Sequence, residues 1–189
     1  MKKIILSFMA VLVSIALPTS VKAADINTSS SSTTAHVKIL SPISINNNVV
    51  MDFGVVARTA STAGTITLPG VTGNPTLSCT NGIIPVSTSQ ATAAKFTVSG
   101  NGGSAYKIVY GATTSIPLGS GDNALKLDLS GPTGTSDLPS SGTIPGNFSA
   151  SPFTIGTDVF YVGGILTIPS AAAYGDYTSS AINVTVAYD

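Results

Sequence analysis

Few side chains in this sequence are of the types that carry out chemistry. His36 is the only histidine, Cys79 is the only cysteine, and the chain contains neither Glu nor Trp. His36 closely follows a polar Ser/Thr tract, which is a poor place for a general base, and no Ser–His–Asp or Cys–His arrangement can be assembled around it. We therefore expect a protein that is not an enzyme, with no catalytic residues and no cofactor.

Two short motifs resemble ligand-binding loops only superficially. Asp122-Asn123 with Asp128 has too few acidic ligands for a calcium loop and lacks the terminal Glu of an EF-hand, so turn capping is the better interpretation. The glycine-rich run 100–103 lies between two predicted strands, whereas a phosphate-binding loop leads into a helix. No cluster has transition-metal spacing, and no basic patch suits nucleic acid. We predict neither a metal site nor nucleic-acid binding.

The single cysteine bears on stability rather than on catalysis. Because Cys79 has no second cysteine to pair with, no intrachain disulfide can form, and the core and strand pairing must stabilise the fold. A lone exported cysteine could be a reactive thiol or an intermolecular link. Leu77, two residues earlier and in the same phase, favours a small buried hydrophobic residue on a strand.

The first 23 residues have the three parts of a secretory signal peptide. Met1 to Lys3 form the positive region, an apolar run extends from Ile4 to Leu17, and Val21-Lys22-Ala23 resembles a cleavage site. The run is shorter than the roughly 20 residues that an N-terminal membrane anchor, the alternative, would need. No later stretch is apolar enough to span a membrane as a helix. We expect export and a mature chain beginning at Ala24.

The rest of the sequence reads as one β-rich domain after a polar extension. Residues 24–34 are a low-complexity polar extension, and 35–189 are rich in Thr, Ser, Gly, Val and Ile, with few helix formers. Period-two alternation of apolar residues predicts strands. These segments lie at 35–45, 51–55, 65–68, 77–79, 96–98, 106–110, 125–129, 160–168 and 182–189. The pattern predicts an all-β fold: an antiparallel, immunoglobulin-like β-sandwich with Greek-key connections.

Turn residues complete this prediction. Asn46-Asn47-Asn48 predicts a turn after the first strand, and Asn81-Gly82 a hairpin. The glycine-rich run 100–103 predicts that strand 96–98 pairs with strand 106–110. Residues 130–151 form a long irregular segment, and loops of that length are usually functional or mobile.

The last predicted strand runs to the final carboxylate. Ile182, Val184, Val186 and Tyr188 alternate with polar or small residues up to Asp189. Most domains end in a few loosely held residues, so a strand that reaches the terminus suggests that the C-terminal strand itself has a function. Four large apolar side chains at an open edge are an aggregation hazard unless another strand covers them.

Four pieces of the chain carry a family resemblance. Gly175-Asp176-Tyr177-Thr178, followed by the alternating strand and penultimate Tyr188, resembles the C-terminal motif of chaperone–usher pilins, which have a penultimate aromatic residue and an upstream glycine. The opening segment 37–45, Asp52-Phe53-Gly54 and Leu77-Ser78-Cys79 resemble the DUF4402 proteins related to archaic, spore-coat-U-like pilins. These pilins often carry a disulfide from the first strand, but here the expected region, Ser41-Pro42, has no cysteine.

The resemblance implies an incomplete sandwich that lacks its last strand and exposes an apolar groove. Residues that would contact a chaperone or a neighbouring subunit are Gly175, Ile182, Val184, Val186, Tyr188 and Asp189. Residues that would act as the donor strand are Ile26, Ala35, Val37 and Ile39, although the last three also fit the subunit's own first strand. The implied partners are a periplasmic chaperone, an outer-membrane usher and like subunits. The implied location is the periplasm and then the surface of a Gram-negative bacterium.

Two functions follow as expectations. The first is a structural subunit of a pilus or fimbria, assembled by donor-strand complementation. The alternative is an adhesin-like binding module, secreted or on the surface, that is completed by its own N-terminal strand and binds through the loop 130–151. An exported hydrolase is disfavoured by the scarcity of catalytic side chains.

Overall fold

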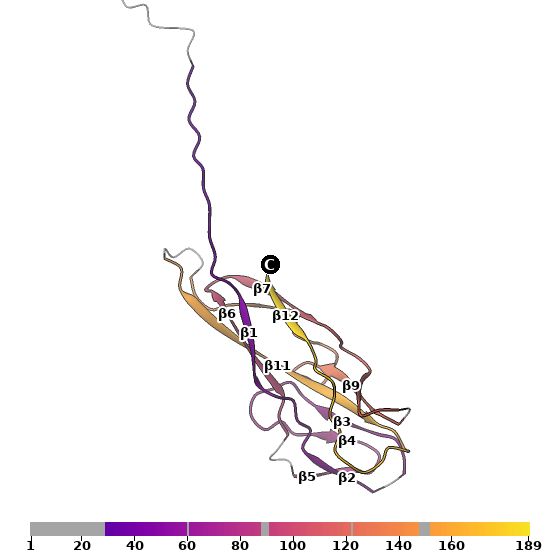
Figure 1. Cartoon of the computed structure of the whole chain (residues 1–189). Coiled ribbons are helices and arrows are strands. Elements are labelled where there is room, and N and C mark those ends of the chain that lie inside the picture. Colours follow the sequence, from indigo (N-terminus) through magenta and orange to yellow (C-terminus); the bar gives the residue numbers. More distant parts are fainter. Residues whose placement is uncertain (1–28, 60, 88–90, 122, 148–151) are drawn as a thin grey trace, which may run out of the picture. The chain divides into compact units, whose positions relative to one another are not determined.

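The computed structural model describes residues 29–59, 61–87, 91–121, 123–147 and 152–189 (Figure 1). The predicted signal peptide and Ile26 lie outside these residues. The chain divides into a unit that ends at Lys38 and a compact unit from Ile39 to Asp189. Residues 29–43 contain no regular secondary structure, so the predicted strand 35–45 is wrong except at its end, where a strand begins at Ser44.

The described part of the second unit contains twelve strands. They are β1 (Ser44–Val49), β2 (Val55–Arg58), β3 (Gly64–Leu68), β4 (Ser78–Cys79), β5 (Ile83–Ser87), β6 (Ala94–Asn101), β7 (Ala105–Tyr110), β8 (Ile116–Leu118), β9 (Leu125–Ser130), β10 (Ser141–Thr143), β11 (Ile155–Ile168) and β12 (Val184–Tyr188). The alternating segments at 65–68, 125–129, 160–168 and 182–189 thus correspond to β3, β9, β11 and β12.

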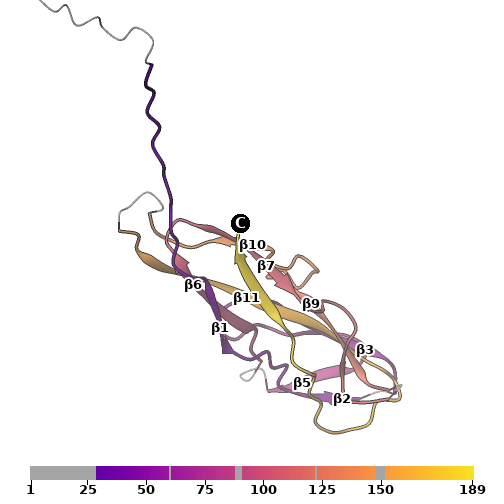
Figure 2. The same cartoon turned by 45° about the horizontal axis from the view of Figure 1, so that its top comes forward.

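The strands form three antiparallel sheets. The largest has the order β1-β6-β11-β3-β4, with β9 also paired to β11 and β8 to β9; the others are β10-β7-β12 and β2-β5. Strand β11 organises the largest sheet because Ile155–Val162 pair with β6, while the residues that follow pair with β3 and β9 (Figure 2). The predicted all-β antiparallel sandwich is confirmed.

The core lies between the largest sheet and the three-stranded sheet. Ile66, Leu68, Val98, Tyr106 and Ile144 are almost fully buried in one continuous apolar cluster. The hydroxyl of Tyr106 donates a hydrogen bond of 2.9 Å to Oδ2 of Asp158. Burial, with this bond and the nearby carboxylate, raises the pKa of the Tyr106 phenol. Tyr106 therefore ties β7 to β11 across the sandwich.

The two predicted hairpins are instead connections between sheets. Strand β6 pairs with β1 and β11, whereas β7 pairs with β10 and β12, so the predicted pairing of 96–98 with 106–110 is wrong. Asn81 and Gly82 do form a left-handed turn, with φ of 51° and 75°, but it joins β4, paired with β3, to β5, paired with β2. Local turn chemistry and alternation are the same for a hairpin and for a crossing between sheets, so they could not separate the two.

The predicted turn at Asn46–Asn48 is also wrong, because these residues belong to β1. Asn46 and Asn47 pair with Thr97 and Phe96 of β6, and a bulge follows Asn47. Asn48 accepts a side-chain hydrogen bond from Thr97. Tertiary pairing thus overrides the turn preference of asparagine. The predicted irregular segment 130–151 contains a short strand, β10.

Candidate functional site

Two strands border an open seam between the sheets. Among the described residues, β12 pairs only with β7, and β1 pairs only with β6. Gly111 N–H donates to the carbonyl of Asn183 at 2.8 Å, and Asp189 N–H to that of Ala105 at 3.2 Å. In an antiparallel ladder such bonded pairs alternate with non-bonded pairs. The backbone N–H and C=O groups of Val184, Val186 and Tyr188 therefore point away from β7, toward the open edge.

The predicted alternation along the terminal strand is confirmed. Ile182, Val184, Val186 and Tyr188 pack against the core cluster, whereas Asn183, Thr185, Ala187 and Asp189 are exposed. The four inward residues are half-buried rather than buried. The strand thus presents both its backbone and its apolar side chains to the seam.

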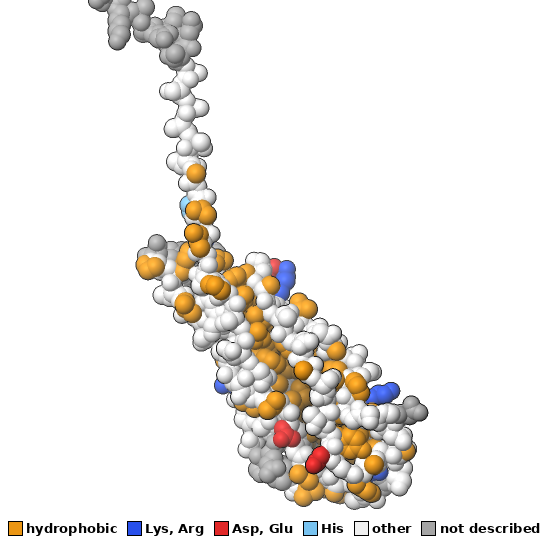
Figure 3. All heavy atoms as spheres, viewed as in Figure 1, with side chains coloured by type: hydrophobic (Ala, Val, Ile, Leu, Met, Phe, Trp, Pro, Cys, Tyr) orange, Lys and Arg blue, Asp and Glu red, His pale blue; other side chains and the backbone are white. Residues whose placement is uncertain are grey.

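A groove of about 910 Å³ opens where this seam reaches Asn47 of β1 and Val184 of β12. One rim is the segment from Asn47 to Val56, and the other is the segment from Gly175 to Val184. The floor consists of apolar side chains from β3, β6, β8, β9 and β11: Ile66, Ala94, Phe96, Leu118, Leu125, Leu127, Leu129, Val162, Leu166 and Ile168. In the space-filling view, hydrophobic side chains run along the middle of this face (Figure 3). The groove can therefore accept an extended, apolar chain segment.

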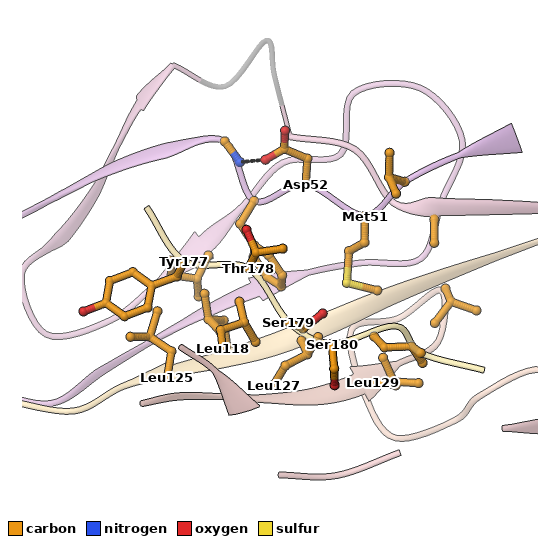
Figure 4. Close-up of a pocket in the computed structure, with 18 of the residues that line it drawn as sticks. Met51, Asp52, Leu118, Leu125, Leu127, Leu129, Tyr177, Thr178, Ser179 and Ser180 are labelled. Carbon is orange, nitrogen blue, oxygen red and sulfur yellow. Dashed lines mark hydrogen bonds between the residues drawn. The ribbon is translucent and has the colours of Figure 1, made fainter. Parts of the chain in front are cut away.

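The Asp52-Phe53-Gly54 motif shapes one rim. Asp52 Oδ1 accepts a hydrogen bond of 2.7 Å from Gly54 N–H, and Gly54 has a left-handed φ of 68° (Figure 4). The backbone of Asp52 also pairs with Thr92 through two bonds of 2.8 Å. Met51 and Phe53, on either side of Asp52, are half-buried and line the groove. The motif thus places Phe53, together with the preceding Met51, in the lining of the groove, a role that the sequence did not reveal.

Tyr188 closes the seam at one end. Its hydroxyl donates to the carbonyl of Ser41 at 2.8 Å and accepts from the N–H of Asn101 at 2.7 Å. Gly100 leaves room for this hydroxyl, because a Cβ there would lie 2.5 Å from it. Ser41 Oγ and Asn101 Oδ1 are buried nearby without a hydrogen-bond partner among the described residues. Tyr188 thereby links β12 to the segment just before β1 and to the last residue of β6.

We expect Tyr188→Phe to lower the free energy of unfolding by about 1–3 kcal/mol, because Asn101 N–H loses its acceptor in a part-buried position. Urea denaturation of the purified chain measures the change. Tyr174→Phe is the matched control, since Tyr174 is 84% exposed. Equal stability of the two variants would contradict the role of the Tyr188 hydroxyl.

Of the other predicted site residues, only Gly175 lines the groove. A Cβ at Gly175 would meet nothing within 4 Å, so no neighbouring residue requires glycine, but its φ of 159° is one that other residues rarely adopt. Asp189 forms an ion pair of 2.5 Å with Lys107, and both side chains are at least half exposed, so the pair contributes little to stability. In the other unit, Ala35 and Val37 are exposed; in the second unit, Ile39 is exposed.

Among the described residues, reactive or metal-binding side chains form no cluster outside the groove. His36 is exposed. Cys79 is half-buried on β4 and packs against the core, and burial raises the pKa of its thiol, as expected for a small hydrophobic residue on a strand. Within the described ranges, no group of three His, Cys, Asp or Glu residues could hold a metal ion. In the same ranges, no helix is long and apolar enough to cross a membrane.

The fold and the groove define an antiparallel β-sandwich with an open seam between two edge strands. Residues 43–188 match the family described as "Domain of unknown function (DUF4402)", and the chain belongs to this family. No curated protein and no solved structure matches the chain.

Proposed function

We propose that this protein is a non-enzymatic structural subunit of a bacterial surface fibre, assembled by donor-strand complementation. The observations that support this proposal are the apolar groove, which Val184 lines, and the unpaired backbone edge that β12 presents at Val184, Val186 and Tyr188. A strand laid along β12 would pair with these groups and place every second side chain in the groove. An uncovered edge of this kind invites such pairing.

The N-terminal segment of another copy has the features that this groove requires. Ala35, Val37 and Ile39 share one face of an extended chain, with His36 and Lys38 on the other. Val37 and Ile39 are 80% and 78% exposed, so both have apolar surface available to bury. Full burial of one such side chain contributes about 1.5–3 kcal/mol. Ile26, earlier in the chain, would supply a further apolar side chain.

The partners and the location belong to the same proposal. An exported subunit with an empty groove needs a periplasmic chaperone to cover the groove. At an outer-membrane usher, the N-terminal segment of the next subunit would then replace the chaperone. The fibre would then stand on the cell surface. The self-complemented adhesin has weaker support, because residues 29–43 form no strand of their own.

Deletion of residues 24–39 tests the proposal. We expect the mature chain to form multimers that survive SDS without heating, and the deleted chain to remain a monomer, because it keeps the groove but lacks the donor. The control replaces the polar residues 29–34 with a Gly/Ser segment of equal length and should still form multimers. A ladder that persists after the deletion, or an intact chain that never forms one, would refute donor-strand assembly.

A further inference from the structure

The small β2–β5 sheet has an unusual outer face. Among the residues of β2 and β5 whose side chains the structure describes, the exposed ones are all apolar: Val55, Ala57, Ile84 and Val86. The three larger ones are 54%, 52% and 63% exposed. The solvent face of an antiparallel sheet is normally polar, and contiguous exposed apolar residues mark an interaction surface. We call these four residues the β2–β5 face.

The one charged residue of these two strands does not contribute to this face. Arg58 is half-buried and donates hydrogen bonds of 2.8 Å to the carbonyls of Pro169 and Ala172. Its guanidinium also lies 5.5 Å from the ring centre of Tyr174. The loop after β11 thus holds the guanidinium, and the outer face carries no charge. A partner for this face must itself be apolar.

The β2–β5 face adjoins the groove at the end opposite Tyr188. Val55 and Val56 line the groove, and Val184 lines it from the other rim. In both cartoon views, β2 and β5 lie at the end of the sandwich that is remote from the C-terminus (Figures 1 and 2). A strand that leaves the groove at this end therefore passes the β2–β5 face.

We propose that the β2–β5 face docks on a second copy of this chain, the copy whose N-terminal segment fills the groove. This inference rests on the proposed function. The sheet β10-β7-β12 is antiparallel throughout. A donor strand that continues this pattern runs antiparallel to β12, from the Tyr188 end toward Val184. Its last apolar residue, Ile39, then emerges beside Val55.

The linker between the two copies is too short to keep them apart. Only Leu40 separates Ile39 from Ser41, which is bonded to Tyr188 within the body of the donor copy. One residue spans at most about 3.6 Å. The Tyr188 end of the donor copy must therefore abut the β2–β5 face of the acceptor copy.

The Tyr188 end offers an apolar counterpart. Ile155 pairs with Asn101, whose N–H is bonded to Tyr188, so Ile155 lies at this end of the molecule. Its side chain is 74% exposed. Contact between Ile155 of one copy and the β2–β5 face of the next would fix the angle between successive copies. The fibre would then be stiff rather than hinged at each linker.

The test is Ile84→Ser combined with Val86→Ser in the full mature chain, with Val109→Ser, 60% exposed on β7, as the matched control. SDS-resistant ladders should form in all three chains, because the groove and the donor are unchanged. The persistence length of the fibres, measured by electron microscopy, should fall about twofold or more only in the double variant, since each junction becomes a flexible linker. An unchanged persistence length overturns this inference alone, whereas the absence of a ladder from the intact chain overturns the proposed function and this inference together.

Cross-linking gives a second measurement that does not depend on stiffness. In a Cys79→Ser chain, Val86→Cys together with Ile155→Cys should be joined between copies by a short bismaleimide, because the two thiols would face each other across the junction. Val109→Cys with Ile155→Cys is the control and should stay unlinked. Equal linkage in both chains, or none in either, would overturn the proposed contact.

Discussion

A peptide with the sequence of residues 29–40 is expected to stabilise a chain shortened to residues 40–189. The shortened chain keeps β1, β12, Ser41 and the whole groove, and it lies within one compact unit. Ala35, Val37 and Ile39 would enter the groove while the peptide backbone pairs with β12. At a peptide concentration of one hundred times Kd, the gain in the free energy of unfolding is about 2.7 kcal/mol. For a domain of this size, each kcal/mol raises Tm by roughly 2–4 °C.

Two altered peptides make this measurement specific. Val37→Asp with Ile39→Asp should abolish the gain, because each carboxylate would be buried among apolar side chains without a partner. Exchanging His36 with Val37 and Lys38 with Ile39 keeps the composition but turns the apolar residues to the other face of the strand. That peptide should also fail. If all three peptides raised Tm equally, the gain would come from non-specific peptide binding, and the groove would not be a strand-binding site.

Gly163→Ala is expected to cost at least about 3 kcal/mol of stability and to prevent folding in the cell. Gly163 is buried in β11, where a Cβ would overlap the carbonyl oxygen of Leu68 and lie 2.6 Å from Gly70 N and 2.7 Å from the carbonyl carbon of Pro69. These are backbone atoms, which cannot rotate away as a side chain can. Strand β11 pairs with β3, β6 and β9, so a shift at Gly163 disturbs most of the largest sheet.

The control for this variant is Gly111→Ala. A Cβ at Gly111 would lie 3.3 Å from Cβ of Asn183, and Gly111 is exposed, so a small adjustment suffices. Urea unfolding and the soluble yield of the two variants give the comparison. A Gly163→Ala chain as stable as Gly111→Ala would show that the backbone near Leu68 moves easily, which would contradict tight packing around Gly163.

Much of the terminal strand could be predicted from sequence because its pattern is local. Side chains of a strand alternate between two faces, so Ile182, Val184, Val186 and Tyr188 had to share one face once the segment was extended. The partner of that strand could not be predicted in this way. Alternation in β6 and β7 is compatible with a hairpin, and only the pairing of β7 with β10 and β12 assigns it to the other sheet.

The N-terminal segment also shows that local alternation does not determine whether a segment pairs as a strand. Ala35, Val37 and Ile39 have the alternation of a strand, but a strand also needs a neighbour with free backbone groups. Both edges of β6 are already paired, one with Ser44–Val49 of β1 and the other with β11. The apolar residues at 37 and 39 therefore remain exposed.

The sequence by itself determined that this protein is all-β, that its last strand alternates to the final carboxylate, and that side chains suited to catalysis are scarce. These properties depend on residue type and on short-range periodicity. Only the tertiary structure decided that β1 and β12 become facing edges, that Tyr188 closes one end of the seam, and that Met51 and Phe53 line the groove. Those features depend on which distant strands pair, and pairing is decided by backbone hydrogen bonds and core packing that no local pattern encodes.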